Sequence, residues 1–163
     1  IGLDDVKTPF GVKKAVLGGS AIYASFAASF FSEPGVVSIA GTDFPAEYKE
    51  VLINQNINID GVMFKGKTFR WSGEYEFDMN EAKTLKTELN SLMDFNANLP
   101  EHYKDSKFVL LGNIDPVLQL KVINQLKNPK LIAMDTMNFW ITGKKKELLE
   151  AIKKVDLLLL NDG

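Results

Sequence analysis

The chain has 163 residues, 45% of them hydrophobic and 25% charged, which predicts a soluble globular protein of about one domain. Its 19 basic and 21 acidic residues give a formal net charge of −2, so charge favours neither nucleic acid nor a membrane surface as a partner. Cysteine is absent, which excludes disulfide frameworks and Cys-based zinc sites and fits a cytoplasmic protein.

Both ends of the sequence look cut. The chain begins with Ile1 rather than Met, and its last residues, DLLLLNDG, stop as a turn begins, so we expect a piece of a larger protein. The apolar run 21–31 is about half as long as a membrane-spanning helix and lacks a basic flank. We therefore expect no membrane span.

The stretch AVLGGSAIYASFAASFF, residues 15–31, joins an apolar strand to a helix through Gly18 and Gly19. It has neither the G-x-G-x-x-G spacing of dinucleotide folds nor the Lys-Ser/Thr of a P-loop. The glycines therefore indicate either a close backbone approach to a neutral ligand or a tight turn before a close-packed helix. The helix is apolar on nearly every side, which predicts burial in the core.

Four short apolar runs predict strands at 36–40, 108–111, 131–134 and 157–160. None alternates with polar residues, as is typical of strands buried on both faces. Helical patterns follow the first three runs, at 45–55, at 116–126 with Asp115 as N-cap and Pro116 at the first position, and at 142–155 with Thr142 as cap. This alternation predicts an α/β fold with a mostly parallel sheet flanked by helices.

The segment TFRWSGEYEFD differs from these runs, because its apolar residues all fall on odd positions from Phe69 to Phe77. A period of two predicts a half-exposed strand, or two strands if Ser72 and Gly73 turn the chain, in a small flap beside the core. An antiparallel edge of the main sheet is the alternative. Residues 82–93 then carry Leu85, Leu89, Leu92 and Met93 at helical spacing.

Polar residues follow each of the four apolar runs: Gly41, Thr42 and Asp43; Asn113 and Asp115; Asp135 and Asn138; Asn161 and Asp162. Ligands of an open parallel sheet bind outside the carboxyl ends of its strands. Each group also fits a helix cap or a turn, and only their repetition at one edge favours a site for a hydroxyl-rich ligand or a metal-bound phosphate. Arg70, on the wet face of the flap, would reach over such a ligand, whereas His102 fits a surface loop.

Together these motifs resemble the N-terminal, substrate-binding half of a ribokinase-like (PfkB-type) carbohydrate kinase. The resemblance covers nearly all of the chain and lies in IGLDD at 1–5, GGSAIYA at 18–24, VVSIAGTDF at 36–44, LLGNIDP at 110–116, LIAMDTMNFW at 131–140 and LLLLND at 157–162. It implies a ribokinase-like α/β fold with a small β-sheet lid formed by segments at about 5–17 and 62–80.

The resemblance also implies site residues. Asp4 would hold sugar hydroxyls, and the other substrate-binding positions would be Gly18, Gly19, Ser20, Tyr23, Arg70, Asn113, Asp115 and Asn138. The family often has asparagine where Tyr23 stands and arginine near Trp140, and the second departure points away from strongly anionic substrates. Asn161 matches the first residue of a motif that organises magnesium and phosphate, whereas the family's catalytic aspartate would lie beyond Gly163.

The implied activity is transfer of a phosphoryl group from ATP, with Mg²⁺, to a hydroxymethyl group of a sugar, a sugar-like polyol or a nucleoside. The segment alone would be inactive, since it supplies the sugar site and the lid. A homodimer formed through the lid is implied by the family alone. Two alternatives are a non-catalytic sugar-binding or regulatory module and a Rossmann-like nucleotide-binding domain.

Overall fold

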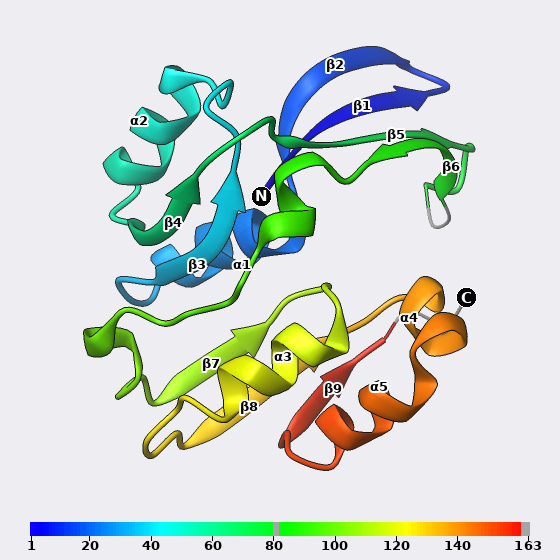
Figure 1. Cartoon of the computed structure of the whole chain (residues 1–163). Coiled ribbons are helices and arrows are strands. Elements are labelled where there is room, and N and C mark those ends of the chain that lie inside the picture. Colours follow the sequence, from blue (N-terminus) through cyan, green and yellow to red (C-terminus); the bar gives the residue numbers. More distant parts are fainter. Residues whose placement is uncertain (80–81, 161–163) are drawn as a thin grey trace. The chain divides into compact units, whose positions relative to one another are not determined.

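The computed structural model describes residues 1–79 and 82–160, and the chain divides into two units, one ending at Phe95 and the other beginning at Asn96. Both units combine strands with helices, as the α/β prediction requires (Figure 1). Within the described residues, none of the helices has the length and hydrophobicity needed to span a membrane.

The first unit contains two sheets. Its elements are β1 (Gly2–Thr8), β2 (Gly11–Gly18), α1 (Ser20–Ser29), β3 (Gly35–Ala40), α2 (Ala46–Asn54), β4 (Asn58–Phe64), β5 (Phe69–Tyr75), β6 (Ala82–Glu88) and the 3-10 helix η1 (Asn90–Asp94). Strands β3 and β4 pair in parallel beside a core built from β1, α1, β3, α2 and β4. The other sheet has the order β2-β1-β5-β6, parallel between β1 and β5 and antiparallel elsewhere (Figure 1).

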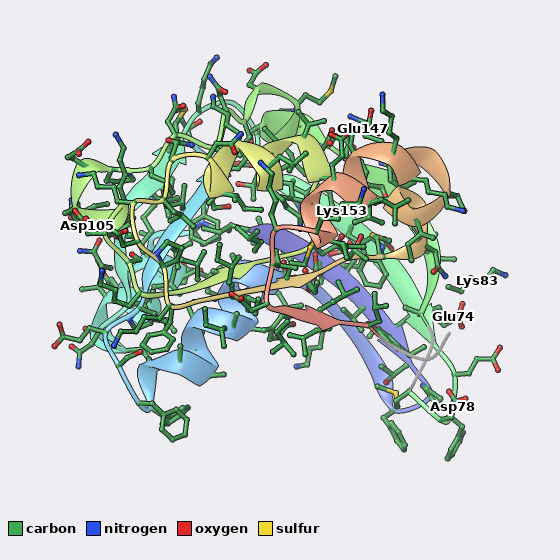
Figure 2. All side chains as sticks on the ribbon, turned by 90° about the horizontal axis from the view of Figure 1, so that it is seen from below. Glu74, Asp78, Lys83, Asp105, Glu147 and Lys153 are labelled. Carbon is green, nitrogen blue, oxygen red and sulfur yellow. The ribbon has the colours of Figure 1, made fainter. Side chains whose placement is uncertain are left out.

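The four-stranded sheet has chemically different faces, as the period of two in the sequence predicts. On one face, Lys7 of β1 forms an ion pair of 2.7 Å with Glu74 of β5, and Lys83 of β6 stands opposite Glu74 (Figure 2). Trp71 and Tyr75 lie on the other face of β5. Residues 69–75 form one continuous strand outside the β3–β4 sheet, so they are neither a hairpin nor an edge of that sheet.

A bulge bends the β1–β2 hairpin. Between the pairs Asp4–Val16 and Val6–Lys13, strand β2 carries one extra residue, and Ala15 adopts a left-handed φ of 51°. The Ala15 N–H donates to Asp5 Oδ1 at 2.8 Å, and the hydroxyl of Tyr48 on α2 donates to the Ala15 carbonyl at 3.0 Å. Both polar groups of this strained residue are therefore held by side chains.

Thr68 anchors the four-stranded sheet to the turn that follows β3. Its side chain is fully buried, and its hydroxyl donates to Asp43 Oδ1 at 2.8 Å and accepts from the Gly41 N–H at 2.9 Å. The Thr68 N–H donates to the same Asp43 oxygen at 2.7 Å. Asn90 Nδ2 donates to the Thr68 carbonyl at 2.9 Å, which ties the segment after β6 to the same point.

The second unit is built on a parallel three-stranded sheet with the order β7-β8-β9. Its elements are the 3-10 helix η2 (Glu101–Tyr103), β7 (Phe108–Leu111), α3 (Pro116–Ile123), β8 (Leu131–Asp135), α4 (Asn138–Gly143), α5 (Lys145–Ile152) and β9 (Leu157–Leu159). Helices α3 and α5 pack on one face of the sheet. Asp115 caps α3 as predicted, because its carboxylate accepts from the Val117 N–H at 3.0 Å.

Two burial predictions were wrong. Strands β7 and β9 are not buried on both faces, since Phe108 is 73% exposed and Leu157 46%. The side chains that alternate with them, such as Leu111, face the α3–α5 layer. Helix α1 is not buried all round either: Ile22 is buried, but Phe31 just beyond the helix is 90% exposed. One neighbouring layer covers only one side of a helix.

Two predictions of local structure were also wrong. Residues 82–93 form strand β6 and the short helix η1 instead of one helix, because the backbone of 82–88 pairs with β5. Leu85 stays 53% exposed, so the helical spacing of the leucines serves no buried face. Thr142 does not cap a helix: it lies inside α4, and its hydroxyl donates to the Asn138 carbonyl at 2.9 Å.

The Thr68 anchor can be tested with Thr68→Val in the full-length protein. The change keeps the shape of the side chain but leaves the buried Gly41 N–H without its acceptor. The free energy of unfolding, measured with denaturant, should therefore decrease by about 1–3 kcal/mol. Thr42→Val is the matched control, because it removes an exposed hydroxyl that donates to the Gly66 carbonyl; its effect should stay within about 0.5 kcal/mol. Equal losses in the two variants would contradict the anchoring role.

Candidate functional site

The glycine pair is explained by the carboxylate of Asp4. Gly18, at the end of β2, stands beside β1, and a Cβ on it would lie 2.0 Å from Asp4 Oδ2. Gly19 precedes α1 with φ 98°, which favours glycine. The group that approaches the Gly18 backbone in the structure is the chain's own Asp4, and the approach of a neutral ligand stays a prediction.

The Asp4 carboxylate lacks hydrogen-bond donors. The residue is half-buried, and no hydrogen bond reaches its carboxylate from residues 1–79 or 82–160. Burial raises the pKa of Asp4, the positive N-terminus of Ile1 lowers it in part, and the charge of Asp5 raises it further. The carboxylate therefore has acceptor positions that water or the hydroxyl groups of a ligand can reach.

Tyr23 lies near Asp4, on the first turns of α1. Its side chain is 64% exposed. Burial of the hydroxyl raises the pKa of Tyr23, and the charge of Asp4 and the neighbouring Tyr75 raise it further. Asp4, Gly18, Gly19 and Tyr23 therefore lie close together, and Ser20 begins the same helix. Their role in substrate binding stays a prediction.

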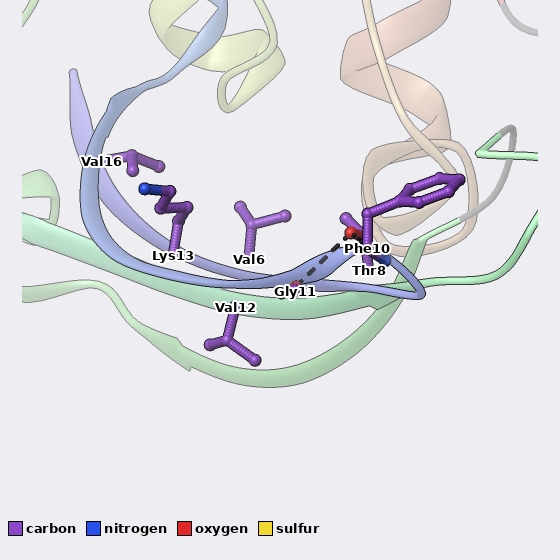
Figure 3. Close-up of a pocket in the computed structure, with 7 residues that line it drawn as sticks. All are labelled: Val6, Thr8, Phe10, Gly11, Val12, Lys13 and Val16. Atoms are coloured by element: carbon purple, nitrogen blue, oxygen red, sulfur yellow. Dashed lines mark hydrogen bonds between the residues drawn. The ribbon is translucent and has the colours of Figure 1, made fainter.

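A hollow opens on the same side of the sheet as Asp4. The curled β1–β2 hairpin borders a wide-open hollow of about 550 Å³, lined by Val6, Thr8, Phe10, Gly11, Val12, Lys13 and Val16. In Figure 3, Val6, Lys13 and Val16 point into the curve and Val12 points away from it. Val16 is the register partner of Asp4, so the carboxylate and the hollow share one face.

The structure does not bring Arg70 to this group. On β5 it stands opposite Leu3, on the face away from Asp4 and Trp71, and its guanidinium lies 3.9 Å from the Asp43 carboxylate. Burial alone would raise the pKa of Asp43, but the hydrogen bonds from Thr68 and the charge of Arg70 lower it below its usual value. Arg70 thus extends the Thr68 anchor.

In the second unit, the predicted residues lie at the carboxyl ends of β7 and β8. Asn113 Oδ1 accepts from the Trp140 indole N–H at 3.0 Å, and Asp115 Oδ2 accepts from Lys144 at 2.5 Å. Asn138 is exposed at the start of α4. Asn161 lies outside the described residues.

Sequence reasoning missed a buried polar group at the same ends of β7 and β8. Gln119 on α3 is 1% exposed, and its amide donates to the carbonyls of Gly112 at 2.9 Å and Asp135 at 3.1 Å. Within the described residues, Gln119 Oε1, Asp135 Oδ1 and Thr136 Oγ1 are buried without a partner. The available signal was a glutamine inside the apolar helix PVLQLKVI.

No group of three His, Cys, Asp or Glu side chains is placed to hold a metal ion among the described residues. Asn161, the predicted metal and phosphate residue, is not among them. We therefore derive no step that depends on Mg²⁺ from this part of the chain.

The chain is similar in sequence to a known kinase. No model of a protein family matches the chain. A cytidine kinase of Thermococcus kodakarensis is 31% identical over 160 residues, which are 97% of this chain and 54% of that protein. The chain thus spans about half the length of this curated relative.

Solved structures show the same fold at low identity. A nucleoside kinase of Methanocaldococcus jannaschii, described as an archaeal member of the ribokinase family, aligns with a TM-score of 0.65 at 17% identity over 95% of this chain and 56% of its own. A putative ribokinase II of E. coli aligns with a TM-score of 0.76 at 14% identity over 96% of this chain and 58% of its own.

The pKa of Asp135 makes a testable prediction about stability. Burial raises this pKa from 3.8 to about 6, so between these values the folded state holds a proton that the unfolded state has released. The free energy of unfolding therefore decreases as the pH rises through this window, and the stabilisation present below it is lost above it. Asp135→Asn stays neutral and should escape this loss.

Thermal unfolding of the full-length protein should show a Tm for Asp135→Asn that is higher by about 2–4 °C at pH 7.5. The difference should vanish near pH 4. Glu150→Gln, an exposed change on α5, should follow the unaltered protein at both pH values. A pH-independent difference for Asp135→Asn would rule out the buried carboxyl as its cause.

Proposed function

We propose that the chain is part of a ribokinase-like (PfkB-type) kinase, and that the whole protein transfers a phosphoryl group from ATP to a hydroxymethyl group of a sugar, a polyol or a nucleoside. The chain spans about half the length of the relatives that it matches. The observation that supports this most is the half-buried Asp4 carboxylate, which lies against Gly18 without a hydrogen-bond donor from the described residues. Such a group is suited to ligand hydroxyls.

Each residue near Asp4 has a role in this proposal. Asp4 accepts hydrogen bonds from substrate hydroxyls, and the backbone of Gly18 and Gly19 forms the floor of the site. Ser20 and Tyr23 line it from α1. For the second unit, the proposal keeps Asn113, Asp115 and Asn138 as the substrate-binding residues that the sequence resemblance implies, although the first two bind Trp140 and Lys144 within that unit.

In the proposed reaction, the substrate hydroxyl oxygen attacks the γ-phosphorus, the bond from that phosphorus to the β–γ bridging oxygen breaks, and ADP leaves. The hydroxyl proton passes to a base. We place the base and the ATP site in a segment beyond this sequence, and Mg²⁺, with Asn161 contributing to its site, would neutralise phosphate charge when bound. The residues described above bind and orient the acceptor.

The four-stranded sheet is proposed to act as a lid. Closing over the substrate would exclude water from the reacting phosphoryl group. The Thr68 anchor and the Tyr48 hydrogen bond to Ala15 fix the base of this sheet, whereas the tip of its hairpin is held by an edge-on contact of 5.6 Å between Phe10 and Phe77. Phe10 and Phe77 are also highly exposed, which supports self-association through the lid.

The site is tested with Asp4→Asn in the full-length protein. Loss of the charged acceptor should weaken binding of the phosphoryl acceptor roughly 10- to 100-fold, the usual effect of a hydrogen bond to a charged group. ATP affinity, measured separately by isothermal titration, should change less than about 2-fold. Glu33→Gln, an exposed change outside the sheet, is the control.

Two results would count against the proposal. Equal losses of affinity for ATP and for the acceptor would remove Asp4 from the acceptor site. Binding of an acceptor without any ADP production from ATP would favour a non-catalytic sugar-binding or regulatory module.

Self-association through the lid predicts that Phe10→Asp converts a dimer into a monomer in sedimentation experiments, because a charge would be buried between the two copies. Phe31→Asp is the matched control, since Phe31 is also highly exposed but follows α1 outside the sheet. Dissociation by both variants, or by neither, would contradict a dimer formed at the hairpin tip.

A further inference from the structure

The face of the sheet that carries Asp4 continues into an aromatic surface. Asp4 and Trp71 are register partners on the parallel strands β1 and β5, so their side chains leave the sheet on the same face. Tyr75 follows on that face, and its ring contacts the indole edge-on with 6.3 Å between centroids. Four residues along β5 extend this surface by about 13 Å from Trp71 to Tyr75.

The Trp71 indole is held in place. Its N–H donates to Thr84 Oγ1 on β6 at 3.1 Å. The ring lies over Gly73, because a Cβ on that glycine would come within 2.0 Å of the indole carbon Cη2. The indole is half-buried, with one side against β5. A ring fixed in this way loses little conformational entropy when a second ring stacks against it.

The walls beside these rings are apolar. Val6 and Val16 point into the curved hollow of about 550 Å³, a volume in the range of small-molecule sites, and Lys13 is the charged side chain seen among them (Figure 3). Tyr23 flanks Asp4 from α1, near Tyr75. A carboxylate acceptor thus stands at one end of an aromatic and apolar surface.

We propose that the ligand of the Asp4 site is a nucleoside, with its ribose hydroxyls on Asp4 and its base against Trp71 and Tyr75. A free sugar needs polar partners around most of its ring, whereas this surface offers them at the Asp4 end and apolar contacts beyond it. A base supplies a planar apolar face of the kind that stacks on aromatic side chains. This inference rests on the proposed function, whose acceptor it specifies.

Stacking on Trp71 can be measured directly in the full-length protein. The sequence contains two tryptophans, so Trp140→Phe removes the second one from this chain's fluorescence. Any tryptophan in a segment beyond this sequence would be replaced in the same background. At least one of the nucleosides cytidine, uridine, adenosine and inosine should then quench the fluorescence of Trp71. Ribose, fructose and inositol should leave this fluorescence unchanged.

Tyr75 tests the position of the base. Tyr75→Leu should lower kcat/KM for the preferred nucleoside roughly 5- to 100-fold, the usual range for loss of a base–aromatic stack. Tyr75→Phe keeps the ring and should stay within about 2-fold. If Tyr75→Leu does not fold, the pair Tyr75→Phe and Tyr75→His, which keeps a planar ring, is compared with Trp71→Phe, which keeps a smaller ring at the other stacking position.

The outcomes separate this inference from the proposed function. Phosphorylation of free sugars without any nucleoside activity would overturn the inference and leave the kinase proposal intact. Nucleoside binding with Trp71 quenching but no ADP production would support the inference and overturn the kinase proposal. Trp71 fluorescence could instead change with protein concentration and not with nucleoside concentration. That result would mean that a second copy of the protein covers the aromatic face, and it would overturn the inference.

Discussion

One close contact in the first unit, that between the Asp4 carboxylate and the backbone of Gly18, restricts which residues can join β2 to α1. A side chain at position 18 would displace the carboxylate, and Gly19 must turn with a positive φ for α1 to begin directly behind it. The contact gives Asp4 no hydrogen bond, and burial makes its charged form less favourable. Folding alone gains nothing evident from such a carboxylate, which is why it carries the functional proposal.

The two faces of the four-stranded sheet carry side chains of different chemistry. One face carries the solvent-exposed ion pair between Lys7 and Glu74. The other face carries Trp71 and Tyr75 next to Asp4. The sheet meets the rest of the first unit at buried, directional hydrogen bonds around Thr68, which leave little freedom at its base. The sheet therefore combines a base fixed by buried hydrogen bonds with an exposed hairpin tip.

Local signals predicted much of the fold. The apolar runs became β3, β7, β8 and β9, and Asp115 with Pro116 marked the start of α3, because a cap and a buried run depend on a few adjacent residues. Strands β1, β4 and β6 were not identified. Their pairing partners lie far away in the sequence, and the leucine spacing in 82–93 indicated a helix that pairing with β5 overrides.

The candidate site was partly predictable for the same reason. Asp4, the glycine pair and Tyr23 belong to short motifs and do come together, whereas Arg70 stands on the other face because strand register, which no local pattern specifies, decides its direction. The buried Gln119 and Thr136 escaped notice because burial of a polar side chain depends on tertiary packing. Asn161 falls outside the described residues.

The left-handed Ala15 has a kinetic consequence. An alanine in this conformation costs of order 1 kcal/mol, and it is retained by the Asp5 carboxylate on one side and the Tyr48 hydroxyl on the other. If either hydrogen bond breaks, Ala15 can relax to a more favourable conformation, so the hairpin beyond the bulge should open more easily than the base of the sheet. Its amides should exchange with solvent faster than those at the base, by fluctuations that leave Asp4 and Gly18 in contact.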